Sequence, residues 1–183
     1  MLKIQIMPTP GKLRLSVNCF LIVLLSTLSI PLLAQKQGIE SGSYRVMLRT
    51  LLSHTVPEVQ VADAAKATNA TLFLDARERN EFEVSHIQGA RWVGYDDFDM
   101  QRVAGIPKET PLVVYCSVGY RSEKISERLL EAGFNDVANL YGGIFEWKNQ
   151  DQSVVNMNGQ STERVHAYNR SWGIWLKEGE RVY

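Results

Sequence analysis

Leu112 to Ser122 reads LVVYCSVGYRS, and this stretch sets the expectation for the rest of the chain. Its first four residues are apolar, with β-branched and aromatic members, which is typical of a strand buried on both faces of a parallel sheet. A short polar loop follows, and apolar residues then recur at helical spacing as far as Gly133, a typical helix stop. Ser122 is the expected helix cap. The stretch therefore predicts a strand, a loop and a helix, with Cys116 where the strand ends.

Cys116 would face the unpaired backbone N–H groups and the positive dipole end of the following helix. Both favour the ionised thiolate, which is the nucleophilic form of cysteine. If the loop amides curl around the sulfur they form an anion-binding nest, to which the charge of Arg121 adds. Cys116 is the predicted nucleophile, and the predicted substrate-binding residues are Ser117, Val118, Gly119, Tyr120, Arg121 and Ser122.

A second polar cluster, Asp-Ala-Arg-Glu at positions 75–78, follows another apolar run. Parallel strands end at the same sheet edge, where α/β proteins bind ligands, so this cluster is expected near Cys116. We expect Asp75 and Arg77 to support the Cys116 loop by hydrogen bonds; a mutually paired surface cluster is the alternative. His86 lies in a turn and is expected to be a structural, hydrogen-bonded residue rather than a general base.

These motifs, taken in order, resemble those of the rhodanese-like (sulfurtransferase) family. The loop at 116–122 is similar to its active-site loop, residues 72–78 to its strand ending in Asp-x-Arg-Glu, and Glu81 with residues 85–90 to its Glu and Gly-His-Ile-x-Gly-Ala, with Ser85 in place of the usual first glycine. The family's closing pattern is matched by Gly133-Phe134, Val137, Leu140, Gly142-Gly143 and Trp147. The resemblance implies an α/β fold, a single rhodanese-like domain whose mostly parallel central sheet is flanked by helices on both faces.

The resemblance also implies an activity, that of a sulfurtransferase of the thiosulfate sulfurtransferase type. Cys116 would take a sulfane sulfur from a small-molecule donor, thiosulfate or a persulfide, and hold it as a Cys116 persulfide. A thiol or cyanide acceptor would then collect the sulfur. Arg121 would orient an anionic donor. No cofactor and no metal are implied.

Two alternatives stay open. Cysteine phosphatases and arsenate reductases also use a cysteine loop that ends in arginine, but their loops hold one residue more than the four between Cys116 and Arg121. A non-catalytic rhodanese-like binding module of the cell envelope is the other alternative. An intact reactive cysteine argues against such a module, which has no need of one.

The first 34 residues have the pattern of a secretory signal peptide. Three basic residues precede an apolar run from Phe20 to Leu33, and Ala34 is a small residue at the expected cut. An uncleaved anchor is the alternative. Removal of residues 1–34 leaves 17 Lys and Arg against 20 Asp and Glu, with Cys116 as the only cysteine. We therefore expect an exported protein, periplasmic if bacterial, without nucleic-acid partners, an intramolecular disulfide or stable membrane insertion.

The remaining chain is expected to divide into three parts. Residues 35–56 would form a tether and an N-terminal helix that packs on the domain. Residues 57–155 would form the rhodanese-like domain, starting with a helix over 57–69. Residues 156–183 would form a C-terminal aromatic extension.

Near its start this extension contains Asn158-Gly159, a strong signal for a β-hairpin formed by residues 153–157 and 160–164. Its apolar residues at helix-face spacing are Tyr168, Trp172, Trp175 and Leu176. We expect them to pack onto the domain as an extra core patch; the alternative is a surface that binds a partner or overhangs the Cys116 pocket.

Overall fold

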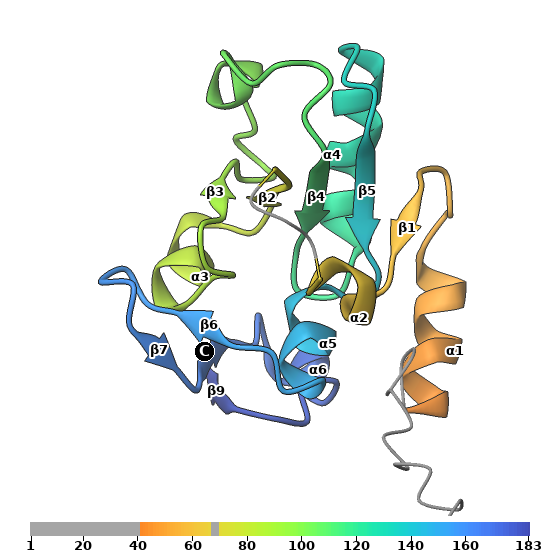
Figure 1. Cartoon of the computed structure of the whole chain (residues 1–183). Coiled ribbons are helices and arrows are strands. Elements are labelled where there is room, and N and C mark those ends of the chain that lie inside the picture. Colours follow the sequence, from red (N-terminus) through yellow and green to blue (C-terminus); the bar gives the residue numbers. More distant parts are fainter. Residues whose placement is uncertain (1–40, 67–69) are drawn as a thin grey trace, which may run out of the picture. The chain divides into compact units, whose positions relative to one another are not determined.

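The computed structural model describes residues 41–66 and 70–183 (Figure 1). The predicted signal peptide, residues 1–34, and the beginning of the predicted tether lie outside the described residues. Within residues 41–66 and 70–183, none of the helices combines the length and apolar character needed to cross a bilayer.

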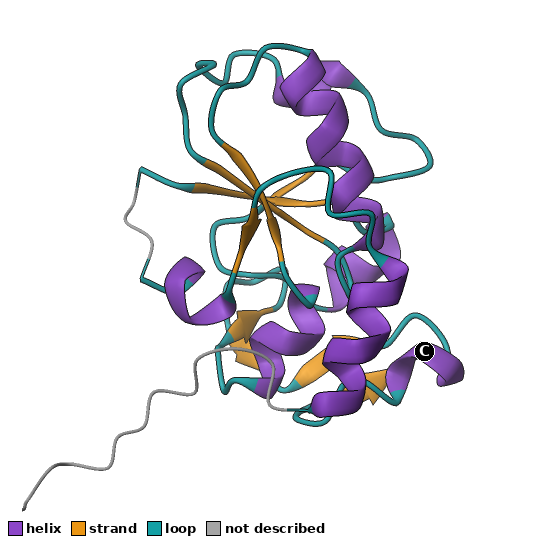
Figure 2. Cartoon of the chain, turned by 90° about the vertical axis from the view of Figure 1, so that its right-hand side faces the viewer, coloured by secondary structure: helices purple, strands orange, loops and turns teal. Residues whose placement is uncertain are grey.

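A parallel sheet stands at the centre of the fold, and the helices surround it (Figure 2). Within the described residues it has five strands in the order β1-β5-β4-β2-β3. They are β1 (Glu58–Val59), β2 (Leu72–Asp75), β3 (Arg91–Trp92), β4 (Leu112–Tyr115) and β5 (Val137–Leu140). β4 lies in the middle, and every one of its residues is buried. The buried strand predicted from its apolar run is confirmed.

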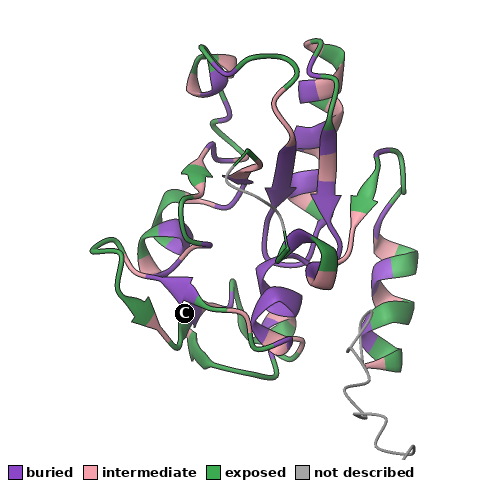
Figure 3. Cartoon of the chain, viewed as in Figure 1, coloured by how far each residue is buried: buried purple, intermediate pink, exposed green. Residues whose placement is uncertain are grey.

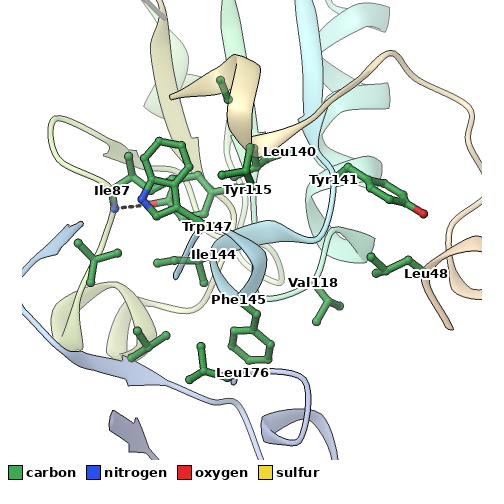
Figure 4. Close-up of a cluster of buried hydrophobic side chains, with 14 of the residues drawn as sticks. Leu48, Ile87, Tyr115, Val118, Leu140, Tyr141, Ile144, Phe145, Trp147 and Leu176 are labelled. Carbon is green, nitrogen blue, oxygen red and sulfur yellow. Dashed lines mark hydrogen bonds between the residues drawn. The ribbon is translucent and has the colours of Figure 1, made fainter. Parts of the chain in front are cut away.

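Successive residues of a strand point to opposite faces of the sheet, so β4 presents apolar side chains on both faces. A different set of helices covers each face. Leu112 and Val114 pack in one apolar cluster with Ile125 of α4. Val113 and Tyr115 pack in the other with α1, α2 and α5 (Figure 4). The helices are α1 (Gly42–Leu51), α2 (Val61–Ala64), α3 (Arg79–Val84), the 3₁₀ helix η2 (Met100–Val103), α4 (Tyr120–Glu131), α5 (Gly143–Asn149) and α6 (Arg170–Gly173). The predicted α/β fold with helices on both faces is confirmed.

The chain before β2 differs from the helix predicted over residues 57–69. Glu58 and Val59 instead form β1, an edge strand that runs parallel to β5. Among the described residues of this segment, the helix is limited to α2, whose Val61 and Ala64 are buried. The spacing of the apolar residues in this segment reflects their burial in the core and not one continuous helix. The backbone of Glu58 and Val59 forms the edge strand of the sheet.

The N-terminal helix α1 packs on the domain, as predicted. The hydroxyl of Tyr44 donates a hydrogen bond to the carbonyl oxygen of Gly142 at 2.9 Å. After the helix, the buried carboxylate of Glu123 accepts from the backbone N–H groups of Ser53 at 3.0 Å and Thr55 at 3.1 Å. These contacts hold the first turn of α1 against the start of α5, and the segment that follows α1 against α4.

The C-terminal extension adds two small sheets. β6 (Val154–Val155) and β7 (Ser161–Thr162) form the predicted antiparallel hairpin, and β8 (Arg164–His166) pairs in parallel with β9 (Glu180–Val182). Val165 and Leu176 are fully buried and belong to the same apolar cluster as α5. Figure 4 shows Leu176 in this cluster, and Figure 3 shows that β6 and most of α5 are buried. The extension is therefore part of the core on this face.

Candidate active site

Cys116 follows directly after β4, and its residue is only 1% exposed. Its carbonyl oxygen accepts the N–H of Ile144 at 2.9 Å, and that of Ser117 accepts the N–H of Phe145 at 3.1 Å. Gly143 makes this close approach possible, because a Cβ there would overlap the carbonyl of Cys116 and lie 2.7 Å from the carbonyl carbon of Ser117. The start of α5 thus fixes the backbone of Cys116 and Ser117.

The loop turns back at Gly119, whose φ of 119° is strained for residues with a side chain. Its N–H donates to the Sγ atom of Cys116 at 3.1 Å. Its carbonyl oxygen accepts from the Oγ of Ser122 at 3.1 Å and from the Nδ2 of Asn139 at 3.0 Å. Among the described amides of the loop, that of Gly119 is the one bonded to the sulfur, so the predicted nest is formed in part.

The predicted cap at Ser122 is wrong. α4 begins at Tyr120 with Gly119 as its N-cap, and Ser122 lies in the first turn, fully buried. Its Oγ is 2.7 Å from the Oδ1 of Asn139 in β5. Ser122 therefore braces the loop from inside the helix.

Arg121 is held by Glu81, which comes from α3. Its Nη1 donates to Oε2 at 2.6 Å and its Nη2 to Oε1 at 2.9 Å. Nη2 also donates to the Oγ of Ser117 at 3.0 Å, and that hydroxyl donates to Glu81 at 3.1 Å. The side chains of Arg121 and Glu81 are 13% and 2% exposed. This bidentate pair fixes the arginine beside the cysteine loop.

The electrostatics keep both partners ionised. Burial alone would raise the pKa of Glu81, but the hydrogen bonds and charge of Arg121 outweigh it and lower that pKa. Burial alone would lower the pKa of Arg121, but the hydrogen bonds to Glu81 and the nearby charges of Cys116 and Glu81 raise it.

Asp75 and Arg77 do not support the loop directly, so that prediction is wrong. They form a fully buried pair, with the Nη2 of Arg77 2.7 Å from the Oδ2 of Asp75. The same Nη2 donates to the carbonyl oxygen of Ser85 at 2.6 Å. In the described residues, the side chain of Glu81 does the bracing instead. Burial and the neighbouring Asp75 raise the pKa of Tyr115, whose hydroxyl accepts the N–H of Ile87 at 3.1 Å (Figure 4).

A cavity of about 330 Å³ reaches Cys116. The cysteine loop and the start of α4 supply part of its lining, namely Cys116, Ser117, Val118, Tyr120 and Arg121. Other elements supply Leu51, Glu78, Tyr95, Asp96, Tyr168 and Trp172. Of the predicted substrate-binding residues, Gly119 and Ser122 are thus behind the cavity wall rather than among its lining residues.

The aromatic residues of the extension separate into two groups. Trp175 stacks on Tyr44 with ring centroids 5.2 Å apart, and Leu176 is buried, so the predicted core patch is confirmed for these two. Trp172 also packs against this core cluster and at the same time lines the cavity. The core-patch prediction is wrong for Tyr168, which is 49% exposed and lines the cavity, as the alternative expected. α6 is a single turn rather than a long helix, so the four residues do not share one face. The guanidinium carbon of Arg121 lies 5.2 Å from the ring centroid of Tyr168.

His86 is not among the residues that line the cavity. Its ring stacks on Phe82 at a centroid distance of 4.0 Å, and its Nδ1 is 3.1 Å from the carbonyl oxygen of the same residue. Within residues 41–66 and 70–183, no group of three His, Cys, Asp or Glu side chains is arranged to hold a metal ion.

Two residues that shape the site were not predicted as part of it. Glu81 belongs to a motif that resembles the family, but its bond to Arg121 forms only because the fold brings α3 beside the cysteine loop. Asn139 is a buried polar residue within an apolar strand, which is the signal that could have identified it.

Comparisons with known proteins place this geometry in context. The family model described as Rhodanese-like domain matches residues 58–150. A curated relative, the tRNA uridine(34) hydroxylase of Yersinia enterocolitica, is 39% identical over 82 residues, which is 42% of this chain and 23% of that protein. The enzyme of the same name from Yersinia pestis shows the same values. The match therefore spans about a quarter of the length of these relatives.

Solved structures share the fold. The thiosulfate sulfurtransferase of Pseudomonas aeruginosa matches with a TM-score of 0.52 and 24% identity, over 73% of this chain and 26% of that one. A rhodanese-like domain from Anabaena matches with a TM-score of 0.51 and 23% identity, over 55% of this chain and 80% of that one. At these identities the likeness concerns the fold.

Proposed function

Because the chain belongs to the family of rhodanese-like domains, we propose that it is a sulfurtransferase that carries a sulfane sulfur on Cys116. The observation that carries the proposal is the position of Cys116. It lies at the wall of a cavity, its sulfur accepts the N–H of Gly119 at 3.1 Å, and Arg121 lines the same cavity. A thiol placed in this way reacts with small molecules while the surrounding backbone holds it in place.

The reaction proceeds in two displacements. In the first, the Cys116 thiolate attacks the outer sulfur of a donor such as thiosulfate, the sulfur–sulfur bond of the donor breaks, and its electron pair leaves with sulfite. In the second, a thiolate or cyanide attacks the outer sulfur of the Cys116 persulfide, and the cysteine thiolate leaves. Because sulfite leaves before the acceptor reacts with the covalent Cys116 persulfide, ping-pong kinetics are expected.

The first test is the intact mass of the purified protein after incubation with thiosulfate and then with cyanide. We expect a gain of one sulfur atom that cyanide removes, and no gain in Cys116→Ser. A folded, reduced protein that gains no sulfur from thiosulfate, a persulfide or a polysulfide would contradict the proposal and favour a binding module.

A cysteine phosphatase is the competing enzyme class. The four residues between Cys116 and Arg121 make the loop one residue shorter than in that class. Hydrolysis of an aryl phosphate by the purified protein, lost in Cys116→Ser, would favour the phosphatase. We expect no such turnover.

Export is a separate proposal, and it rests on the sequence of residues 1–34 alone. N-terminal sequencing of the protein isolated from its own cells is expected to start near Gln35. A chain that retains its leader and stays in the cytoplasmic fraction would contradict export.

A further inference from the structure

The cavity at Cys116 is walled partly by residues outside the segment that the family model matches. Leu51 comes from α1, and Tyr168 and Trp172 come from the C-terminal extension. The matched segment, residues 58–150, contains none of these three. The shape of the cavity is therefore a property of this chain and not of the family segment alone.

The size and lining of the cavity suit an organic group. Its volume of about 330 Å³ is that of pockets which hold organic ligands, whereas thiosulfate is a small inorganic anion. Tyr95, Tyr120, Tyr168 and Trp172 place four aromatic side chains around it. Aromatic rings bind apolar and aromatic groups well and gain little from a small, strongly hydrated anion.

The charges around the cavity disfavour a dianion. Among the described residues that line the cavity, Arg121 is the one cation, and Glu81 engages both of its terminal nitrogens. Two lining carboxylates, Glu78 and Asp96, add negative charge, with the Oε1 of Glu78 3.8 Å from the Nη1 of Arg121. A donor that enters the cavity passes two carboxylates, whereas Glu81 already compensates the positive charge of Arg121. A dianionic donor is therefore disfavoured.

We propose that the sulfur donor is an organic sulfane-sulfur compound with an apolar body and at most one negative charge, and that Tyr168 and Trp172 select it by binding this body. The proposal rests on the sulfurtransferase function and names its substrate class. The Cys116 thiolate bonds to the terminal sulfur, and the sulfur–sulfur bond of the donor breaks. The electron pair leaves on the organic fragment, as a thiolate from a persulfide or a sulfinate from a thiosulfonate.

Tyr168 is the better of the two positions for a test, because its side chain is a wall of the cavity and yet the residue is 49% exposed. Removal of the Tyr168 side chain is therefore not expected to unfold the protein. Ile174 is a matched control: it lies directly after α6, is 53% exposed and does not line the cavity. Tyr168→Phe keeps the ring and should keep the selectivity.

The experiment compares kcat/KM for benzenethiosulfonate, methanethiosulfonate and thiosulfate, with cyanide as acceptor and thiocyanate as the measured product. The first two donors carry the same charge and differ in the phenyl ring. In the natural protein we expect the order benzenethiosulfonate, methanethiosulfonate, thiosulfate. In Tyr168→Ala and Trp172→Ala, the ratio of the first two should fall roughly three- to tenfold, the size of one aromatic contact.

The carboxylates give a second, independent measurement. Glu78→Gln removes one negative charge from the cavity, so the use of thiosulfate relative to benzenethiosulfonate should rise about two- to fivefold, as expected for a partly exposed charge. Ile174→Ala should leave all these ratios unchanged.

The outcomes separate the two proposals. A phenyl-to-methyl ratio that stays the same in both aromatic variants, or a preference for thiosulfate in the natural protein, overturns the substrate class and leaves the sulfurtransferase intact. Absence of thiocyanate from every donor overturns the sulfurtransferase function itself, and the substrate class with it.

Discussion

Among single residues, Glu81 controls how firmly Arg121 is held at the site. Its carboxylate makes two hydrogen bonds to the guanidinium and is almost fully buried. Glu81→Gln would leave the positive charge of Arg121 largely buried without its partner. We expect unfolding free energy to fall by roughly 2 to 4 kcal/mol, with loss of sulfur-transfer activity. Urea unfolding and the thiocyanate assay measure the two effects.

The pH dependence of this variant follows from the lowered pKa of Glu81. A carboxylate whose pKa is lower in the folded state stabilises the protein above its ordinary value of 4.5, and the contribution disappears as pH falls through the folded value. The difference between the natural protein and Glu81→Gln should therefore shrink below about pH 4.5. Glu83→Gln, in the same helix but in a half-exposed pair with Arg79, is the control and should change stability by less than about 0.5 kcal/mol.

His166 gives stability a second pH dependence at higher pH. Burial, reinforced by the charges of Arg77 and Arg121, lowers the pKa of His166 from 6.5 and outweighs the opposite effect of Glu81. Its Nδ1 accepts the N–H of Tyr168 at 3.1 Å, a bond that a proton on Nδ1 would abolish. Stability should be complete above about pH 6.5 and decrease as pH falls below it, because the unfolded state then binds more protons.

His166→Asn keeps an acceptor at a similar position and cannot be protonated. Thermal unfolding between pH 7.5 and 5.5 should therefore depend less on pH in the variant than in the natural protein. Equal slopes in the two proteins would contradict the assignment.

Among the secondary-structure elements, the junction of β5 and α5 controls the geometry of the cysteine loop. A Cβ at Gly143 would overlap the backbone of Cys116 and Ser117, and its φ of 58° also disfavours a side chain. Gly143→Ala should cost roughly 3 kcal/mol or more in unfolding free energy and abolish sulfur transfer, since the overlap is with rigid backbone. Chemical denaturation measures the first effect and the thiocyanate assay the second.

Gly133 is a control for Gly143 that has the backbone strain without the steric overlap. It too has a positive φ, of 87°, but a Cβ there would have nothing within 4 Å. Gly133→Ala should therefore cost only about 1 kcal/mol and leave sulfur transfer near its natural rate. Equal losses in the two variants would show that strain alone, and not the contact with Cys116, makes Gly143 necessary.

The same elements explain how much the sequence could predict. Strand β4, the position of Cys116 and the end of α4 shortly before Gly133 follow from local patterns, and each was predicted. The pairing of Glu81 with Arg121 joins residues 40 positions apart, which no local pattern specifies. The roles predicted for Asp75 and Arg77 were wrong for the same reason. Charged side chains at the end of a strand can bond to the neighbouring loop or to each other, and the local sequence does not specify which.

For the whole molecule, the segments outside the family-matched region belong to the core. Tyr44 and Leu48 from α1, and Val165 and Leu176 from the extension, are buried in one cluster with α5. A fragment of residues 57–155 would expose the apolar surface that they cover. The full chain should unfold in one transition, and the fragment should be less stable by at least 4 kcal/mol or insoluble, since several large side chains lose their contacts.

Urea unfolding followed by tryptophan fluorescence and by circular dichroism provides the comparison. A fragment as stable as the full chain would show that the extension is only attached to a finished domain. The sequence predicted that α1 and the aromatic residues of the extension pack on the domain, and it gave a position over the Cys116 pocket only as the alternative for these aromatic residues. It could not show that Tyr168 and Trp172 are the two that line this pocket. That outcome depends on the shortness of α6 and on the fold bringing Tyr168 and Trp172 to the same cavity as the start of α4.

The burial of Cys116 also determines which oxidation products form when the protein is stored in air. A disulfide needs two Cα atoms within roughly 7 Å of each other. A cysteine that is 1% exposed cannot approach its counterpart in a second molecule so closely while both remain folded. In the chain without residues 1–34, Cys116 is the only cysteine. Storage of that protein without reductant should therefore yield monomers whose sulfur is oxidised by small reagents such as peroxide, rather than covalent dimers. A non-reducing gel band at twice the monomer mass would then indicate unfolding.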